Sequence, residues 1–120
     1  MTEHDIQSAF FSKCETLSLT YPEFNKIYAI PNGGLRNKIV ARKLKKEGVK
    51  SGIPDVFVAV PRNGYHGLYI EFKCGKNKLT KNQAVWFEKL SECAYKCEVC
   101  YSSIDAINIL FDYLNIERKK

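Results

Sequence analysis

The sequence has no hydrophobic run long enough to span a membrane. Its apolar runs, such as "VFVAV" at residues 56–60, are far shorter than the roughly 20 residues that a spanning helix requires. The first residues, "MTEHDIQ", also lack the basic start and apolar core of a secretory signal. We therefore expect a cytoplasmic protein that does not associate with membranes.

Long tracts of serine, glycine, proline or glutamine are absent as well, which argues against disorder. Hydrophobic residues make up 45% of the 120 residues and aromatic residues 12%, so burial can offset the conformational entropy lost on folding. A chain of this length suits one hydrophobic core and is too short for two. We predict a single domain over residues 1–120, frayed only at the final "ERKK".

Acidic residues are few compared with basic ones. The net charge is +6 and the pI about 9.1, and residues 36–50 hold seven Lys or Arg against one acid, Glu47. This uneven charge favours a polyanionic partner. A solvated helix kept basic for solubility is the alternative interpretation of the same segment.

Apolar spacing predicts eight elements in the order α-β-α-β-β-α-β-α, which is an α/β fold with a small mixed sheet flanked by helices. Helices are expected over residues 3–20, 36–47, 81–94 and 103–114, behind capping residues that include Thr2, Thr80 and Ser102 or Ser103. Strands are expected over residues 26–30, 54–60, 67–72 and 97–101. Asn63-Gly64 predicts that the two middle strands form an antiparallel hairpin.

Charged residues interrupt the second strand of this hairpin, "LYIEFK". Side chains alternate between the faces of a strand, so Glu71 and Lys73 share the face opposite Leu68, Ile70 and Phe72. By itself this spacing also fits a solvated ion pair on a wet face, worth less than about 1 kcal/mol.

The hairpin register decides whether Asp55, at the entrance of the first strand, meets Glu71. A two-residue turn at Asn63-Gly64 would place Asp55 opposite Phe72, on the wrong face. A three-residue loop, or a bulge near Gly67, would place Asp55 opposite Glu71 with Cβ atoms about 5 Å apart. The sequence leaves both registers open.

Two carboxylates at that distance repel each other unless a cation lies between them, and their oxygens suit Mg²⁺ or Mn²⁺. Lys73, one pleat further along, would face the same place. Asp55, Glu71 and Lys73 would then form the set that metal-assisted phosphodiester hydrolysis requires, with the ammonium orienting water or steadying the phosphate.

At these residues the sequence resembles the PD-(D/E)xK nuclease superfamily, with Pro54-Asp55 and Glu71-Phe72-Lys73 as the motif. The further segments "PNGG", "GIPD" and "LTKNQ" resemble the virus-type replication-repair nuclease (VRR-NUC) domain, over residues 3–110. The resemblance implies a restriction-endonuclease-like core. It also implies a metal held by Asp55, Glu71 and the main-chain carbonyl of Phe72, with Lys73 as the catalytic lysine.

Two further residues match the family pattern but have structural alternatives. Glu3 would approach the metal through water, although it also suits the first turn of a helix. Gln83 matches a glutamine found after the catalytic lysine, although it also suits a capping box with Thr80. Phe87 stands where some related nucleases have a tyrosine.

The resemblance implies an Mg²⁺- or Mn²⁺-dependent DNA endonuclease in a bacterial or phage-infected cell. We expect a homodimer that is selective for branched DNA, such as a four-way (Holliday) junction. A non-catalytic DNA-binding or accessory protein, or a nuclease of ordinary duplex, are the alternatives. Phosphate contacts are expected from Arg36, Lys38, Arg42, Lys43, Lys45, Lys46, Lys76, Lys78 and Lys81.

Three of the five cysteines, Cys93, Cys97 and Cys100, have the C-x3-C-x2-C spacing of radical S-adenosylmethionine enzymes. We discount that interpretation, because Cys97 and Cys100 fall on opposite faces of a short strand. An iron-sulfur cluster that includes Cys14 is a remaining alternative to free thiols, which a reducing compartment favours.

Overall fold

The computed structural model describes residues 1–31 and 38–119, which form the predicted order of helices and strands. Along the chain these elements are α1 (Glu3–Leu17), η1 (Pro22–Lys26), β1 (Ile27–Ala29), α2 (Lys38–Lys46), β2 (Val56–Val58), β3 (Leu68–Phe72), α3 (Lys81–Glu92), β4 (Lys96–Cys100) and α4 (Ser103–Leu114). The α/β class is confirmed, and the 3₁₀ helix η1 is an addition to it. Arg36 and the "NGG" of the predicted turn lie outside the described residues.

Some predicted boundaries were wrong by a few residues. The first helix ends at Leu17 and not near residue 20, because the chain tightens there into turns in which Thr20 and Tyr21 both donate to the Leu17 carbonyl. The first hairpin strand is confined to Val56–Val58.

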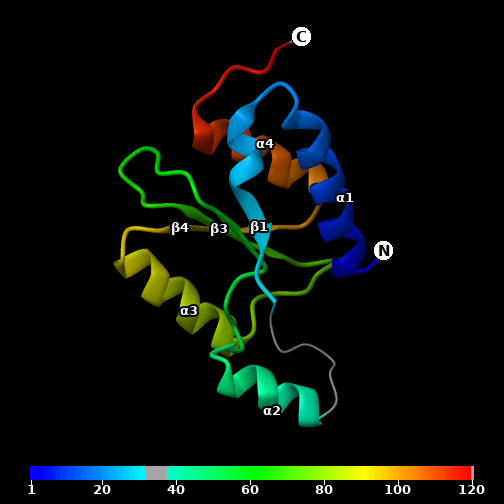
Figure 1. Cartoon of the computed structure of the whole chain (residues 1–120), viewed down its shortest axis with the longest axis vertical. Coiled ribbons are helices and arrows are strands. Elements are labelled where there is room, and N and C mark those ends of the chain that lie inside the picture. Colours follow the sequence, from blue (N-terminus) through cyan, green and yellow to red (C-terminus); the bar gives the residue numbers. More distant parts are fainter. Residues whose placement is uncertain (32–37, 120) are drawn as a thin grey trace.

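The strands form a mixed sheet in the order β1-β2-β3-β4 within the described residues (Figure 1). β1 pairs with β2 and β2 with β3 in antiparallel fashion, whereas β3 and β4 run parallel. A parallel pair needs a crossover connection, and α3 supplies it. None of the described helices is long and apolar enough to cross a membrane.

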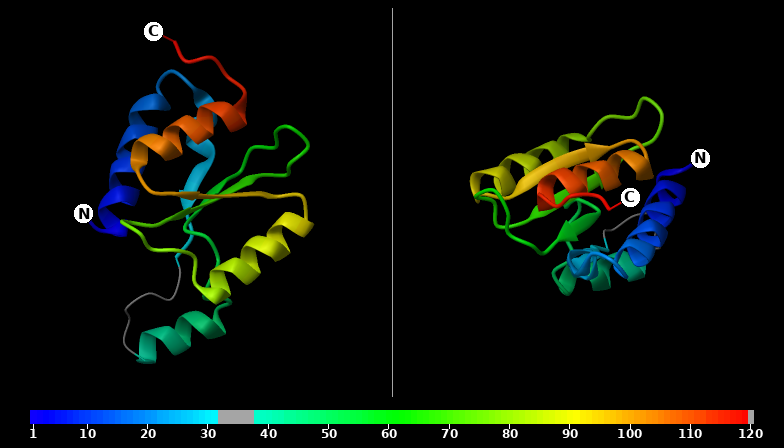
Figure 2. Two further views of the ribbon diagram at one scale, coloured as in Figure 1. Left: turned by 180° about the vertical axis from the view of Figure 1, so that it is seen from behind. Right: turned by 90° about the horizontal axis from the view of Figure 1, so that it is seen from above.

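Helices cover the two faces of the sheet unequally. α1 and α4 pack together over one face (Figures 1 and 2). On that face Leu68, Ile70 and Phe72 of β3 are fully buried, and the ring centroids of Phe10 and Phe72 lie 5.3 Å apart. α3 packs against β4 on the other face, where Cys97 lies against the carbonyl of Phe87. The hydrophobic core therefore lies on the α1/α4 side.

The hairpin combines both of the features that the sequence left open. Asn63 and Gly64, at φ 54° and 84°, form a tight turn in which Arg62 pairs with Tyr65. Val58 nevertheless pairs with Leu68, although three residues separate Val58 from Arg62 and only two separate Leu68 from Tyr65. A bulge next to the turn absorbs the extra residue, and it gives the register that brings Asp55 to Glu71.

Gly67 allows the chain to close around this bulge. A Cβ at Gly67 would come within 2.7 Å of the Phe57 ring and 3.0 Å of the Val58 carbonyl oxygen. A side chain at this position would therefore push against the strand that carries Asp55.

We predict that Gly67→Ala lowers the free energy of unfolding by about 1–3 kcal/mol, the usual range for overpacking. In a Phe57→Ala background the loss should be smaller by at least about 0.5 kcal/mol, because the ring that the new methyl group meets has been removed. Urea denaturation of the four proteins of this double-mutant cycle measures the difference. Equal losses in both backgrounds would show that the Phe57 ring is not the obstacle.

Candidate active site

The predicted carboxylates come together at the ends of β2 and β3. Asp55 directly precedes β2, and the observed register, which pairs Val56 with Ile70, continues to place Asp55 across from Glu71. Asp55 is held there because the main-chain N–H of Phe72 donates to its Oδ2 atom over 2.8 Å. The sheet therefore fixes the two carboxyl groups on one face.

Glu71 and Lys73 are buried, with 2% and 6% of their surface exposed. The solvated ion pair that the sequence allowed is therefore wrong. Burying a charge is costly unless the charge is compensated, and these two are the buried charged residues of the described chain. The buried charge of Glu71 must therefore be compensated by a bound cation, or the carboxyl group must take up a proton.

Gln83 performs both of the tasks that the sequence offered as alternatives. Its Oε1 accepts from the Thr80 N–H at 2.9 Å, while its own N–H donates to Thr80 Oγ1 at 3.2 Å, which completes a capping box for α3. The same side chain donates from Nε2 to Glu71 Oε2 at 3.1 Å. The helix cap thus fixes the amide that orients the glutamate.

The charge of Glu71 is strongly disfavoured by its surroundings. Burial is the largest cause that raises the pKa of Glu71 to about 8, followed by the charge and hydrogen bond of Asp55. The ammonium of Lys73 opposes this rise, and the carboxylate of Glu3 adds to it. A cation at this position would reverse the balance and favour the ionised form.

One oxygen of the Glu71 carboxyl group bears on whether a cation fits at this position. Glu71 Oε1 is buried and receives no hydrogen bond from any donor among the described residues. Oxygen ligands from two carboxylates are the donors that Mg²⁺ and Mn²⁺ prefer, so the residues fit a divalent metal. In residues 1–31 and 38–119, no group of three or more His, Cys, Asp and Glu side chains is arranged to hold one.

Glu3 lies close enough to influence Glu71 without capping its own helix. The capping box of α1 consists of Thr2 and Asp5, whose Oδ2 accepts from the Thr2 N–H at 2.8 Å. The sequence analysis missed Asp5 in this role, although a Thr followed three residues later by an acid is a signal for it. Glu3 itself lies in the first turn of α1, as the structural alternative expects, and is half-buried, and its charge also affects Glu71.

The predicted DNA-contacting residues fall into two exposed groups. One group is on α2, which lies beyond the start of α3 in Figure 1, and the other follows β3 directly. The side-chain amide of Asn82 donates from Nδ2 to the Ser51 carbonyl oxygen at 2.9 Å and to Ser51 Oγ at 2.8 Å. These hydrogen bonds join the segment after α2 to the first turn of α3. All the described members are exposed: Lys38, Arg42, Lys43, Lys45, Lys46, Lys76, Lys78 and Lys81.

The cysteines do not converge on one place. Cys14 and Cys100 are buried in the main core, Cys97 lies on the other face of the sheet, and Cys93 is exposed. Burial raises the pKa of Cys14 and Cys100 to about 12 and that of Cys97 to about 11, so these thiols are protonated at neutral pH. A bound metal would itself deprotonate a thiol, so it is the separation of these cysteines that argues against a shared cluster among the described residues.

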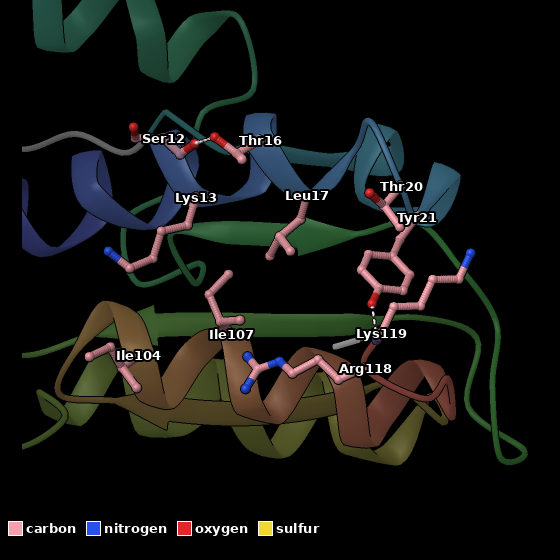
Figure 3. A pocket seen from close by; sticks show the side chains of 10 residues that line it. All are labelled: Ser12, Lys13, Thr16, Leu17, Thr20, Tyr21, Ile104, Ile107, Arg118 and Lys119. Atoms are coloured by element: carbon pink, nitrogen blue, oxygen red, sulfur yellow. Dashed lines mark hydrogen bonds between the residues drawn. The ribbon is translucent and has the colours of Figure 1, made fainter.

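A groove of about 630 Å³ lies between α1 and α4, away from the carboxylates. In Figure 3, Leu17 and Ile107 point toward each other across its floor, and Lys13 and Arg118 flank them. None of the predicted site residues lines this groove. The candidate site lies instead at the end of the sheet, where Glu71 and Lys73 are buried.

The mixed sheet with helices on both faces, together with Asp55, Glu71 and Lys73 at its end, is the arrangement of the PD-(D/E)xK nucleases. Within that superfamily, the VRR-NUC domain model matches residues 3–104, and the chain belongs to the VRR-NUC family. It therefore contains a nuclease domain, whose substrate class is DNA.

A solved structure described as a VRR_NUC domain protein has the same fold. It superimposes with a TM-score of 0.80 at 28% sequence identity, and the match covers 96% of this chain and 89% of that chain. A comparison with curated proteins gives no match.

The raised pKa of Glu71 predicts how the metal-free fold responds to pH. Because the folded chain favours the protonated carboxyl group, the contribution of Glu71 to stability is full below about pH 4.5 and is lost as the pH rises toward 8. We expect Glu71→Gln, which cannot ionise, to melt several degrees higher than the unaltered chain at pH 8 in EDTA. The difference should vanish near pH 4.5.

Calorimetry across this pH range measures the effect, and Glu98→Gln on the neighbouring strand β4 is the matched control. Glu98 is half-exposed and lies 3.9 Å from Lys96, so its replacement should not reproduce the trend. A melting difference for Glu71→Gln that stays constant with pH would contradict the assignment.

Proposed function

We propose that the chain is a divalent-metal-dependent DNA endonuclease that hydrolyses phosphodiester bonds. The observation that carries this proposal is the buried Glu71 carboxylate, which faces Asp55 and has an oxygen without a hydrogen-bond donor among the described residues. Burying two carboxyl groups side by side is costly for a fold, so packing alone does not explain this pair. Two such carboxylates are useful where a cation must be held.

Asp55, Glu71 and the main-chain carbonyl of Phe72 would hold Mg²⁺ or Mn²⁺. The ion would supply positive charge that stabilises the phosphate in the transition state and would acidify a water molecule. Gln83 keeps Glu71 oriented through the 3.1 Å hydrogen bond. Glu3 acts from α1 through water.

Lys73 supplies the remaining charge. The residue is 6% exposed and its positive charge acts on Glu71, and a charge in such a largely buried position interacts more strongly with a developing negative charge than it would in water. We assign it to orienting the attacking water or steadying the phosphate. The exposed lysines that follow β3, at positions 76, 78 and 81, would continue the same positive path along the DNA backbone.

The basic helix α2 would bind DNA phosphates independently of the base sequence. Its lysines and arginine are exposed, and it carries no buried residue, so it is not used to build the core. Contacts of this kind position DNA without reading its sequence. They support recognition of DNA by shape, and we propose branched DNA as the preferred substrate.

A homodimer would suit such a substrate. A two-fold axis would present two identical sites to the opposed strands of a four-way junction. Ordinary duplex is the alternative substrate, and a non-catalytic DNA-binding role is the alternative function. The second is disfavoured because Asp55, Glu71 and Lys73 are all present and are held together.

We predict that Asp55→Asn, Glu71→Gln and Lys73→Met each lower the rate of metal-dependent cleavage by at least about a hundredfold. The first two remove a negative charge that would hold the metal, and the third removes the positive charge that would act on the water or the phosphate. Affinity for DNA in EDTA should stay within about threefold, because the basic residues that bind phosphates are retained. Single-turnover cleavage and fluorescence anisotropy measure the two quantities.

Lys96→Met is the control for these variants, because Lys96 is a half-buried lysine on β4 that pairs with Glu98. It should cut at the normal rate. An undiminished cleavage rate for purified Asp55→Asn protein would contradict the mechanism.

A panel of matched duplex, single-stranded, flap and four-way DNA, each tested with Mg²⁺, Mn²⁺ and EDTA, examines the substrate. We expect the branched substrates to be cut at least about tenfold faster than the duplex, and none in EDTA. Light scattering in parallel should give the mass of a dimer. Equal rates on all duplex-containing substrates, or a strict monomer, would remove the junction proposal and leave a duplex nuclease.

A further inference from the structure

A row of aromatic side chains crosses the sheet on the face opposite the main core. The strand register pairs Tyr28 with Phe57 and Phe57 with Tyr69. Their ring centroids lie 5.8 Å and 4.5 Å apart, and Tyr95 closes on Tyr69 at 5.4 Å. We call Tyr28, Phe57, Tyr69 and Tyr95 the aromatic row.

The aromatic row lies directly beside the candidate active site. Phe57 is two residues after Asp55 on one strand, and Tyr69 is two residues before Glu71 on the next. Residues two apart on a strand share a face and lie about 7 Å from each other. The carboxylates and the aromatic rings are thus neighbouring rows on one surface of the sheet.

Packing of the core does not account for this row. Val56, Val58, Leu68 and Ile70, which alternate with its members, are fully buried under α1 and α4. Phe57 and Tyr69 are only half-buried, because α3 packs against β4 at the other edge of the sheet. Tyr28, on β1, has 51% of its surface exposed.

We propose that the aromatic row is a stacking platform for an unpaired base of the DNA strand that is being cut. The proposal rests on the proposed function, because the carboxylates beside the row define where the phosphate lies. Every base presents a flat π-face, and stacking on tyrosine or phenylalanine is a general way to hold single strands. A base in an intact duplex is already stacked on its neighbours and cannot use the platform.

The platform would therefore supply part of the substrate choice. DNA whose nucleotides are unpaired next to the cut phosphate, at a flap or a branch point, gains the stacking contact, and intact duplex does not. A second copy of the chain is a less suitable occupant of this surface. Packed against the aromatic row, it would also cover the carboxylate row one pleat away and so exclude the DNA.

Tyr28→Leu tests the platform, because Tyr28 is exposed and its replacement leaves the core intact. Tyr28→Phe retains the ring, and Tyr65→Leu is the matched control on the hairpin, where Tyr65 is 37% exposed. The probe is a flap oligonucleotide with 2-aminopurine at the unpaired nucleotide next to the branch, bound in EDTA so that nothing is cut. Stacking quenches its fluorescence.

We expect quenching by the unaltered chain, by Tyr28→Phe and by Tyr65→Leu. Tyr28→Leu should lose the quenching and bind the flap about tenfold more weakly, with an unchanged salt dependence because no phosphate contact is lost. In Mg²⁺, the ratio of flap to duplex cleavage should fall about tenfold for Tyr28→Leu alone.

Full quenching by Tyr28→Leu would overturn the platform even if Asp55→Asn is inactive, so the two proposals fail separately. Cutting of the flap by Asp55→Asn would remove the proposed function, whatever the fluorescence shows. Conversion of a dimer to a monomer by Tyr28→Leu, seen by light scattering without DNA, would identify the row as a contact between copies and would also overturn the platform.

Discussion

The pairing register of β2 with β3 is the constraint on which the remaining features of this domain depend. Side chains alternate along a strand, so a slip of one residue would turn Asp55 toward the α1/α4 core and away from Glu71. The tight turn at Asn63-Gly64 would by itself impose that slip. The bulge beside it restores the other register, in which Val56 pairs with Ile70 and Asp55 faces Glu71. One extra residue near the turn thus decides which side chains face each other at the far end of the hairpin.

The end of this hairpin also carries an energetic cost. Glu71 is buried where its charge is disfavoured, and its pKa of about 8 measures that strain. The surrounding structure holds it in place regardless, through full burial of Ile70 and Phe72 on the other face and through the hydrogen bond from Gln83. Gln83 is in turn fixed by the cap of α3. An unfavourable buried group persists only where the surrounding structure holds it in place, as these contacts do here.

Local signals in the sequence were sufficient for much of the fold. Apolar periodicity and capping residues such as Thr80 predicted the order of the elements. The family came from a resemblance carried by several motifs together, among them "GIPD", "EFK" and "LTKNQ". The register was beyond local signals, because the turn at Asn63-Gly64 and the bulge beside it favour different alignments, and only the paired strands show which one holds. Burial of Lys73 was likewise hidden, since an alternating strand looks the same whether its polar face is wet or covered. The dual role of Gln83 required the helix and the strand to be placed together.

The register also links the two rows on the open face of the sheet. Pairing of Phe57 with Tyr69 and of Asp55 with Glu71 follows from one alignment, because both pairs belong to the same two strands. A slip would therefore disperse the aromatic row and separate the carboxylates at the same time. Gly67 lies beside the aromatic row as well as beside the bulge, because a Cβ at Gly67 would clash with the Phe57 ring. The bulge thus aligns the aromatic row with the pair of carboxyl groups on the same face of the sheet.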